Sequence, residues 1–315
     1  MKTPNILKTS VSIHDAKFIK THQFSCGHSV PIFEVTTMHA LNQIIGYSKF
    51  INRQYGYVFY RGQCELYNTL LPSLIRNTNP NKGPISVSTA TTRIGQQLTK
   101  MINDHKLSNE LQMSTNSDTI NRLKFESILQ HYGAPTRFID LVDNHWIALW
   151  MGLYRFETVK NLLSYCRYEK RIIPYIDALH KKTIISEKEI YQYILLVAFP
   201  NGKNIAPGIT ETKDHIIIDL RQALPSTFLR PHAQHALVAK VRYNNSDAEK
   251  KYYDLAKNVI GIVRIRIDRA DKWMGSGELL TQSNLFPPAA YDNGYDILLS
   301  RTDLFDGLYT IARYV

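Results

Sequence analysis

An arginine and a glycine come directly after an apolar run near the start of the chain. The run is Val58–Tyr60, and Arg61-Gly62-Gln63 follow it. A short run of β-branched and aromatic residues indicates a buried strand, so the sequence predicts a strand that delivers a guanidinium to its end. A guanidinium can hold a phosphate through two parallel hydrogen bonds. The simpler alternative is a surface arginine at a strand end.

A second group of chemically capable residues lies in the segment QHYGAPTR, residues 130–137. Gly133 suits the left-handed cap of a preceding helix, and Pro135 prevents the helix from continuing. Turns held by rigid elements often carry binding sites. Arg137 and Asp140 are three residues apart and are expected to pair, so a structural turn with a salt bridge is the alternative. The candidate site residues here are His131, Tyr132, Thr136 and Arg137.

A third group precedes a strand pattern in FLRPHAQHALVAKV, residues 228–241. Gln234 can donate and accept hydrogen bonds, but an amide cannot serve as a general base at neutral pH. His232 and His235 could ligate a metal, although such residues at a strand entry are more typical of structural hydrogen bonds. The three cysteines are far apart and form no Cys-x-x-Cys pair, so we expect neither a disulfide framework nor a metal.

The charge composition and the absence of several enzyme motifs limit the classes of binding partner and activity to be expected. The 315 residues include 38 Lys and Arg against 27 Asp and Glu, a formal net charge of +11, which favours polyanionic partners such as nucleic acid. Walker A, Gly-x-Gly-x-x-Gly, Gly-x-Ser-x-Gly and His-Glu-x-x-His motifs are absent from the sequence. No secretory signal and no apolar run long enough for a membrane helix occur, so we expect a cytoplasmic protein with no membrane partner.

Hydrophobic periodicity predicts helices over residues 36–56, 91–107, 119–133 and 143–157, with Thr91 or Thr92 capping the second and Asp143 or Asn144 the fourth. Residues 22–35 resemble a hairpin, 108–118 a loop, and 156–185 a helical segment. Ser186 and Glu189 form a possible capping box. Strand-like segments then dominate to residue 268. The order predicts an α+β fold: an N-terminal extension at 1–39 and a single domain at 40–315, with a helical N-terminal elaboration on a mixed or antiparallel β core.

These motifs together resemble the FRG domain family. The family motif Phe/Tyr-Arg-Gly corresponds to Tyr60-Arg61-Gly62, followed by Gln63 and by Leu-Pro-Ser-Leu-x-Arg at residues 71–76. A Gln-His-Tyr-Gly-x-Pro-Thr-Arg run is intact at residues 130–137. Arg230 and Gln234 fit a third motif loosely, and Leu-Phe-Pro at 285–287 fits the end. The resemblance covers roughly residues 40 to 300.

The family in turn resembles mono-ADP-ribosyltransferases, which implies an ADP-ribosyltransferase-like core and NAD as cofactor. By that resemblance Arg61 grips the NAD phosphates and Gly62 lets backbone approach the cofactor. Tyr60, Gln63 and Arg137 would also contact it, and His131, Tyr132 and Thr136 would line the nicotinamide and ribose pocket. Arg61, His131 and Gln234 would be the catalytic residues.

Gln234 departs from this pattern, because transferases of this kind usually carry a catalytic glutamate there. Another carboxylate could serve, with Glu126, Asp140 and Glu278 as candidates, or the acceptor needs no base, or the fold has lost activity. The resemblance implies a toxin of a toxin–antitoxin or phage-defence system, with RNA or DNA as acceptor and an antitoxin protein as possible partner. The alternatives are a non-catalytic nucleotide- or nucleic-acid-binding module and a metal-independent ribonuclease that uses His131.

Overall fold

A computed structural model describes residues 3–76, 86–110, 118–159, 165–173, 186–242, 249–275, 280–301 and 313–314. The chain forms two compact units, each built from three separate stretches. Unit 1 comprises residues 1–69, 142–201 and 256–281. Unit 2 comprises residues 70–141, 202–255 and 282–315. Because the units interleave in sequence, each one depends on segments that are far apart along the chain.

Unit 1 contains a mixed sheet in the strand order β1-β2-β12-β7-β3. Strands β2 and β12 are parallel, whereas the other neighbours are antiparallel. Strand β7 is buried on both faces almost throughout, in keeping with its continuous apolar run ILLVAF. The bounds are β1 Ala16–Gln23, β2 Ser29–Val35, β3 Gly56–Gln63, β7 Tyr191–Pro200 and β12 Val259–Arg266.

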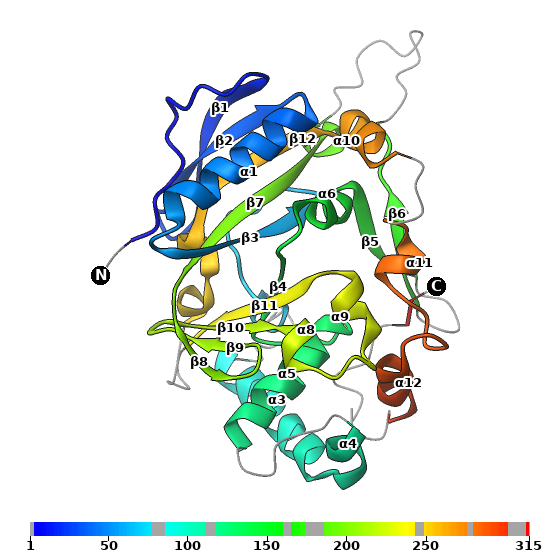
Figure 1. Cartoon of the computed structure of the whole chain (residues 1–315). Helices are drawn as coiled ribbons and strands as arrows, with labels where there is room; N and C mark the ends of the chain where they lie inside the picture. Colours follow the sequence, from blue (N-terminus) through cyan, green and yellow to red (C-terminus); the bar gives the residue numbers. More distant parts are fainter. Residues whose placement is uncertain are drawn as a thin grey trace. The chain divides into compact units, whose positions relative to one another are not determined.

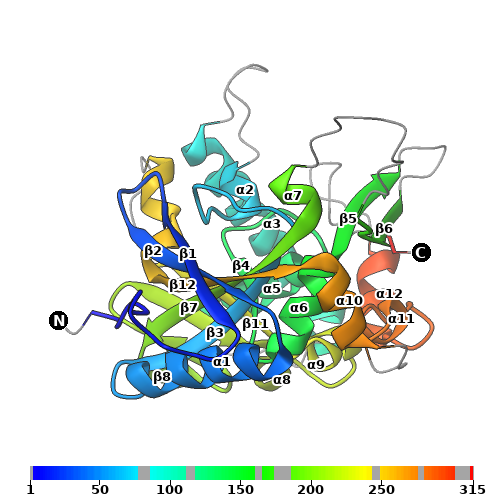
Figure 2. The ribbon, with the colours of Figure 1, turned by 90° about the horizontal axis from the view of Figure 1, so that it is seen from above.

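Two helices pack on one face of β3 in unit 1, α1 Met38–Asn52 and α6 His145–Leu153 (Figure 2). Side-chain oxygens of Thr37 and Asn144 cap them by accepting from backbone N–H groups of the first turn. The remaining elements of this unit are the hairpin of β5 Tyr154–Val159 and β6 Tyr165–Lys170, and the helices α7 Glu187–Ile190 and α10 Ile267–Met274.

Unit 2 contains the strand order β4-β11-β10-β9-β8, with antiparallel pairing along β11-β10-β9-β8 (Figure 1). The last residue of β4, Val142, belongs to unit 1 and pairs with Tyr60 there. The strands are β4 Ile139–Val142, β8 Lys203–Ala206, β9 Ile209–Glu211, β10 His215–Asp219 and β11 Ala236–Val241.

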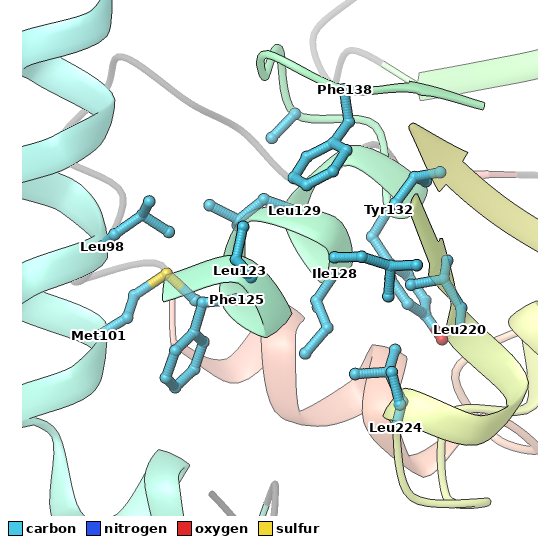
Figure 3. Packing of buried hydrophobic residues seen from close by; sticks show 14 of the residues in the cluster. Leu98, Met101, Leu123, Phe125, Ile128, Leu129, Tyr132, Phe138, Leu220 and Leu224 are labelled. Atoms are coloured by element: carbon cyan, nitrogen blue, oxygen red, sulfur yellow. The ribbon is translucent and has the colours of Figure 1, made fainter. Parts of the chain in front are cut away.

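Helices α3 Val87–Asn103 and α5 Asp118–His131 form the core of unit 2 together with these strands. Leu98 and Met101 of α3 pack against the buried face of α5, and Tyr132 and Phe138 continue that core past the helix end (Figure 3). The other elements are the helices α2 Ser73–Arg76, α4 His105–Glu110, α8 Leu220–Ala223, α9 Leu229–Ala233, α11 Gln282–Leu285 and α12 Asn293–Ser300, and the 3-10 turns η2 Lys250–Tyr253 and η3 Leu255–Asn258, of which η3 continues into unit 1.

Most predicted elements are confirmed: the 22–35 hairpin, all four helices, the Asn144 cap, the capping box of Ser186 with Glu189, and the late strands. The mixed α and β composition is confirmed as well. The cap of α3 is Ser86 rather than Thr91 or Thr92, because Ser86 accepts from the backbone N–H of Thr89. The predicted N-terminal extension at 1–39 supplies β1 and β2 to the sheet of unit 1.

Three expectations about the fold were wrong. The chain opens with β1, β2, α1 and β3, so the N-terminal part is not a helical elaboration. The described part of 156–185 forms the β5–β6 hairpin, and residues 174–185 lie outside the described residues. Helix α4 occupies the start of the predicted loop at 108–118, whereas 111–117 are not described. None of the helices in the described segments is long and apolar enough to cross a bilayer.

Candidate functional site

The end of β3 presents Arg61 and Gln63 on one face of the sheet in unit 1, because residues two apart in a strand point to the same side. Arg61 is half-buried and lies opposite Leu195 of β7. Gln63 lies opposite Tyr193, and its side-chain oxygen is buried without a hydrogen-bond partner among the described residues. Burial, with the charge of Glu187, raises the pKa of Tyr193 to about 12, so this phenol is neutral.

The alternate residues of β3, Tyr60 and Gly62, point to the other face, toward α6. A side chain on Gly62 would meet the Ala148 carbonyl oxygen at 1.8 Å, so this glycine permits close packing between strand and helix. The Tyr60 ring is fully buried and lies edge-on to His145, with ring centroids 5.9 Å apart. Helix packing therefore accounts for both residues. Their predicted contact with a cofactor stays a prediction.

The segment 130–137 is held in unit 2 by a chain of side-chain hydrogen bonds. The Thr136 hydroxyl donates to Gln130 Oε1 at 2.6 Å and accepts from the Phe138 backbone N–H. Gln130 Nε2 then donates to Asp140 Oδ2 at 2.7 Å. Gly133 adopts a φ of 96°, the left-handed conformation expected for a helix cap. The polar groups of this turn thus bond to one another and fix its shape.

Arg137 pairs with Glu126 rather than with Asp140, so the expected Arg137–Asp140 pair is wrong. Its Nε and Nη2 donate to the two carboxylate oxygens at 2.8 and 2.7 Å, and Lys240 Nζ donates to Glu126 Oε2 at 2.9 Å. Burial alone would raise the pKa of Glu126, but the two cations outweigh it and hold that pKa well below the usual range. Burial lowers the pKa of Lys240 to about 8. Glu126 is therefore committed to a structural triad.

His131 and Tyr132 close the end of α5 and are both buried. Burial, with the nearby charge of Arg230, lowers the pKa of His131 to about 3, so its imidazole is neutral at pH 7. Its Nε2 has no hydrogen-bond partner among the described residues. The Tyr132 hydroxyl donates to Asp292 Oδ2 at 2.7 Å. His131 consequently keeps a nitrogen available for a ligand, whereas the Tyr132 hydroxyl is already bonded.

Arg230 of α9 is completely buried and surrounded by aromatic rings. Its guanidinium carbon lies 4.4 to 5.3 Å from four ring centroids, those of Tyr132, Tyr314, Tyr295 and Phe286. Its Nη1 donates to the His131 carbonyl at 3.4 Å. Asp292 accepts from the backbone N–H of Arg230 at 3.1 Å but forms no hydrogen bond to the guanidinium. A buried cation thus stands at the end of α5.

Gln234 caps α9 and is 3% exposed, with Nε2 donating to the Leu285 carbonyl at 2.6 Å. This contact joins the third motif to the closing Leu-Phe-Pro segment. Unit 2 therefore brings together the motif residues His131, Tyr132, Arg230, Gln234, Leu285 and Phe286, while Tyr60, Arg61, Gly62 and Gln63 lie in unit 1. The predicted convergence of Arg61, His131 and Gln234 stays a prediction.

Sequence reasoning did not assign a site role to Arg230, Lys240 or Asp292. Lys240 interrupts the strand pattern ALVAKV, and a lysine within such a strand is a signal for a buried carboxylate partner. Glu126 likewise interrupts the apolar stripe of α5. Glu278, a candidate catalytic carboxylate, lies outside the described residues. Within the described part of the chain, no three His, Cys, Asp or Glu side chains gather to hold a metal ion.

Comparison with known proteins identifies one family. Residues 56–159 match the family model of the FRG domain, which spans both the Tyr-Arg-Gly strand and the Gln130–Arg137 turn. This confirms the resemblance drawn from those two motifs, over a shorter range than residues 40 to 300. No curated protein and no solved structure gives a significant match.

Proposed function

We propose, on the premise that this chain carries an FRG domain, that it is an NAD-dependent ADP-ribosyltransferase that modifies nucleic acid. The observation that carries the proposal is the placement of Arg61 and Gln63 on one face at the end of β3. A half-buried guanidinium next to an amide oxygen that is buried without a partner in the described part of the chain offers both a phosphate donor set and an acceptor.

The residues of unit 1 fit a dinucleotide in chemical terms. Arg61 would hold the pyrophosphate through its guanidinium, and Gln63 Oε1 would accept from a hydroxyl or amide N–H. NAD, when bound, supplies the bond between ribose C1′ and nicotinamide. In the transfer that bond breaks, nicotinamide leaves with the electron pair, and the acceptor forms a new bond to C1′ and loses a proton.

The net charge of +11 supports a nucleic-acid acceptor, since basic side chains neutralise phosphates along the strand. A chain of this activity would be toxic to its own cell unless restrained. We therefore include in the proposal a role as the toxin of a toxin–antitoxin or phage-defence system, with an antitoxin protein as partner.

A second candidate, a non-catalytic nucleotide-binding module, is favoured by a specific observation. Glu126 is held by two cations, and the Gln234 amide is engaged with Leu285. Neither group is placed to take a proton from an acceptor. The ribonuclease alternative is not favoured, because a histidine with a pKa of about 3 is a poor proton shuttle near neutral pH.

The test incubates the protein with NAD labelled in the ADP-ribose part and, separately, with RNA, DNA or cell extract. Released nicotinamide and transferred label are both measured. We expect label on nucleic acid, and a loss of about 100-fold for Arg61→Gln. The matched control is Arg53→Gln, which removes an exposed arginine that follows α1 in the same unit and should leave the activity unchanged.

The outcomes separate the candidates. Label on protein alone would keep the transferase and reject the nucleic-acid acceptor. NAD that binds but is never consumed would support the binding module. Equal activity in the Arg61→Gln variant and the parent protein would reject the assigned role of Arg61.

A further inference from the structure

The buried guanidinium of Arg230 has an unused hydrogen-bonding edge. Its Nε and Nη2 are both buried, and neither has a hydrogen-bond partner among the described residues. The only hydrogen bond from this guanidinium among those residues runs from Nη1 to the His131 carbonyl. A buried charge that lacks a bonded acceptor is costly, so its presence requires an explanation.

The same two atoms hold carboxylates elsewhere in this protein. Arg137 uses Nε and Nη2 to hold Glu126, and Arg264 uses them to hold Glu34. Arg221 uses them to hold Asp219. The N–H bonds of Nε and Nη2 lie in the guanidinium plane and point the same way, so they match two oxygens of one carboxylate or phosphate. In Arg230 this pair of donors meets no acidic side chain among the residues that the structure describes.

Asp292 does not accept hydrogen bonds from Nε and Nη2 of Arg230. Its two carboxylate oxygens accept from the Tyr132 hydroxyl and from the backbone N–H groups of Arg230 and Tyr295. These bonds place the carboxylate near Arg230, but none of them engages the Nε–Nη2 edge. The carboxylate thus positions the α9 backbone and the Tyr132 ring around the guanidinium.

The neighbouring groups suit a ligand of mixed character. Tyr132, Tyr295, Tyr314 and Phe286 surround the guanidinium with aromatic surface. The buried Nε2 of His131, whose backbone carbonyl accepts from Arg230, also lacks a partner among the described residues. Donors, a neutral imidazole and aromatic rings are what a small site for an oxyanion carries when it excludes bulk water.

We propose that the Nε–Nη2 edge of Arg230 is a binding site for a ligand oxyanion, either a carboxylate or a phosphate group. The site belongs to unit 2 alone and does not depend on the proposed transfer from NAD. Arg230 would hold the two oxygens side-on, as Arg137 holds Glu126. The aromatic rings would keep water away and so strengthen the ion pair.

The experiment follows the thermal unfolding midpoint of the full chain at fixed ionic strength while chloride is replaced by inorganic phosphate or by acetate. We expect a saturable rise, roughly 5 °C at 100 times the dissociation constant, for one anion or both. A response to phosphate alone identifies a phosphate ligand, and a response to acetate alone a carboxylate. No saturable response to either anion overturns the proposal.

Two variants test whether the anion-dependent rise of the unfolding midpoint comes from binding at Arg230. Arg230→Lys keeps the charge but loses the two-atom edge, and it should lose the response. Arg221→Lys alters an arginine of the same unit whose edge is filled by Asp219, and it should keep the response. An unchanged response in Arg230→Lys would place the anion elsewhere and overturn the proposal.

A measurement on the parent protein covers the case in which Arg230→Lys fails to fold. The Nε–H resonance of Arg230 should stand apart, because four aromatic rings shift it. That resonance should move as the anion is added, in step with the thermal response. If no ring-shifted Nε–H resonance moves, the proposal fails whatever the variant does.

Discussion

Arg137 holds both carboxylate oxygens of Glu126, with Nε 2.8 Å from Oε1 and Nη2 2.7 Å from Oε2. The carboxylate is 1% exposed and also accepts from Lys240. Glu126→Gln should lower the free energy of unfolding by about 3 to 5 kcal/mol, because it leaves two cations without their shared counter-ion. Urea unfolding at pH 7 measures this loss. Glu157→Gln, which removes an exposed partner of Arg167, should cost less than about 1 kcal/mol.

The ion pair of Glu126 with Arg137 should also make the free energy of unfolding depend on pH in the acid range. The pKa of Glu126 is depressed in the folded state, so its contribution is complete above the unfolded pKa, about 4.5, and is lost as pH falls toward the folded value. The difference between the parent protein and Glu126→Gln should therefore shrink as the pH falls below about 4.5. A difference that grows on acidification would contradict the assigned direction.

His131 should also make the folded protein less stable in acid, over a higher pH range than Glu126. Its pKa is about 3 when folded and about 6.5 when unfolded, so between these values the unfolded state binds the extra proton. Lowering the pH from 7 to 5 should decrease the free energy of unfolding of the parent protein by about 2 kcal/mol. The His131→Gln variant should not show this decrease. Unfolding curves at the two pH values test this. His39→Gln, on the exposed side of α1, should behave like the parent protein.

Gly62 should tolerate no side chain. In Gly62→Ala the new carbon would meet the carbonyl oxygen of Ala148, and the backbone of α6 would have to move. We expect a loss of at least about 3 kcal/mol, or an insoluble protein. Gly95→Ala is the matched control, because no atom lies within 4 Å of its added carbon and the site is inside α3. It should gain up to about 1 kcal/mol.

A carboxylate at position 234 should increase neither stability nor NAD turnover. In Gln234→Glu the buried oxygen would face the Leu285 carbonyl that now accepts from Nε2 at 2.6 Å. We expect a loss of about 1 to 3 kcal/mol and no increase in nicotinamide release from NAD. Gln54→Glu, at an exposed position, should leave both quantities unchanged. A gain in NAD turnover would show that position 234 contributes directly to transfer.

Local signals in the sequence predicted most elements well. The α6 cap at Asn144 and the strand β7 follow from short-range chemistry: a capping amide and an unbroken apolar run. The β5–β6 hairpin escaped prediction because its charged residues, such as Arg155 and Glu169, are neutral between helix and strand patterns. Only the pairing of two segments fixes them as strands.

The hydrogen-bond partners of the candidate site residues could not be predicted from the sequence. Arg137 and Asp140 are close in sequence, yet the turn directs Asp140 to Gln130 and Arg137 back to Glu126, eleven residues earlier. The contact of Gln234 with Leu285 spans 51 residues. Such pairings depend on how distant segments pack, which neither composition nor periodicity records.

The interleaving of the two units has a consequence for synthesis. Strand β3 needs β7 as its neighbour, and the sheet of unit 1 is complete only when β12 at Val259–Arg266 has been made. A growing chain therefore cannot finish either unit first and then begin the other. The stretch 56–159 that matches the family model is a shared portion of both units, so it should not fold when expressed alone. Neither unit can therefore be complete before the segment that contains β12 has been made.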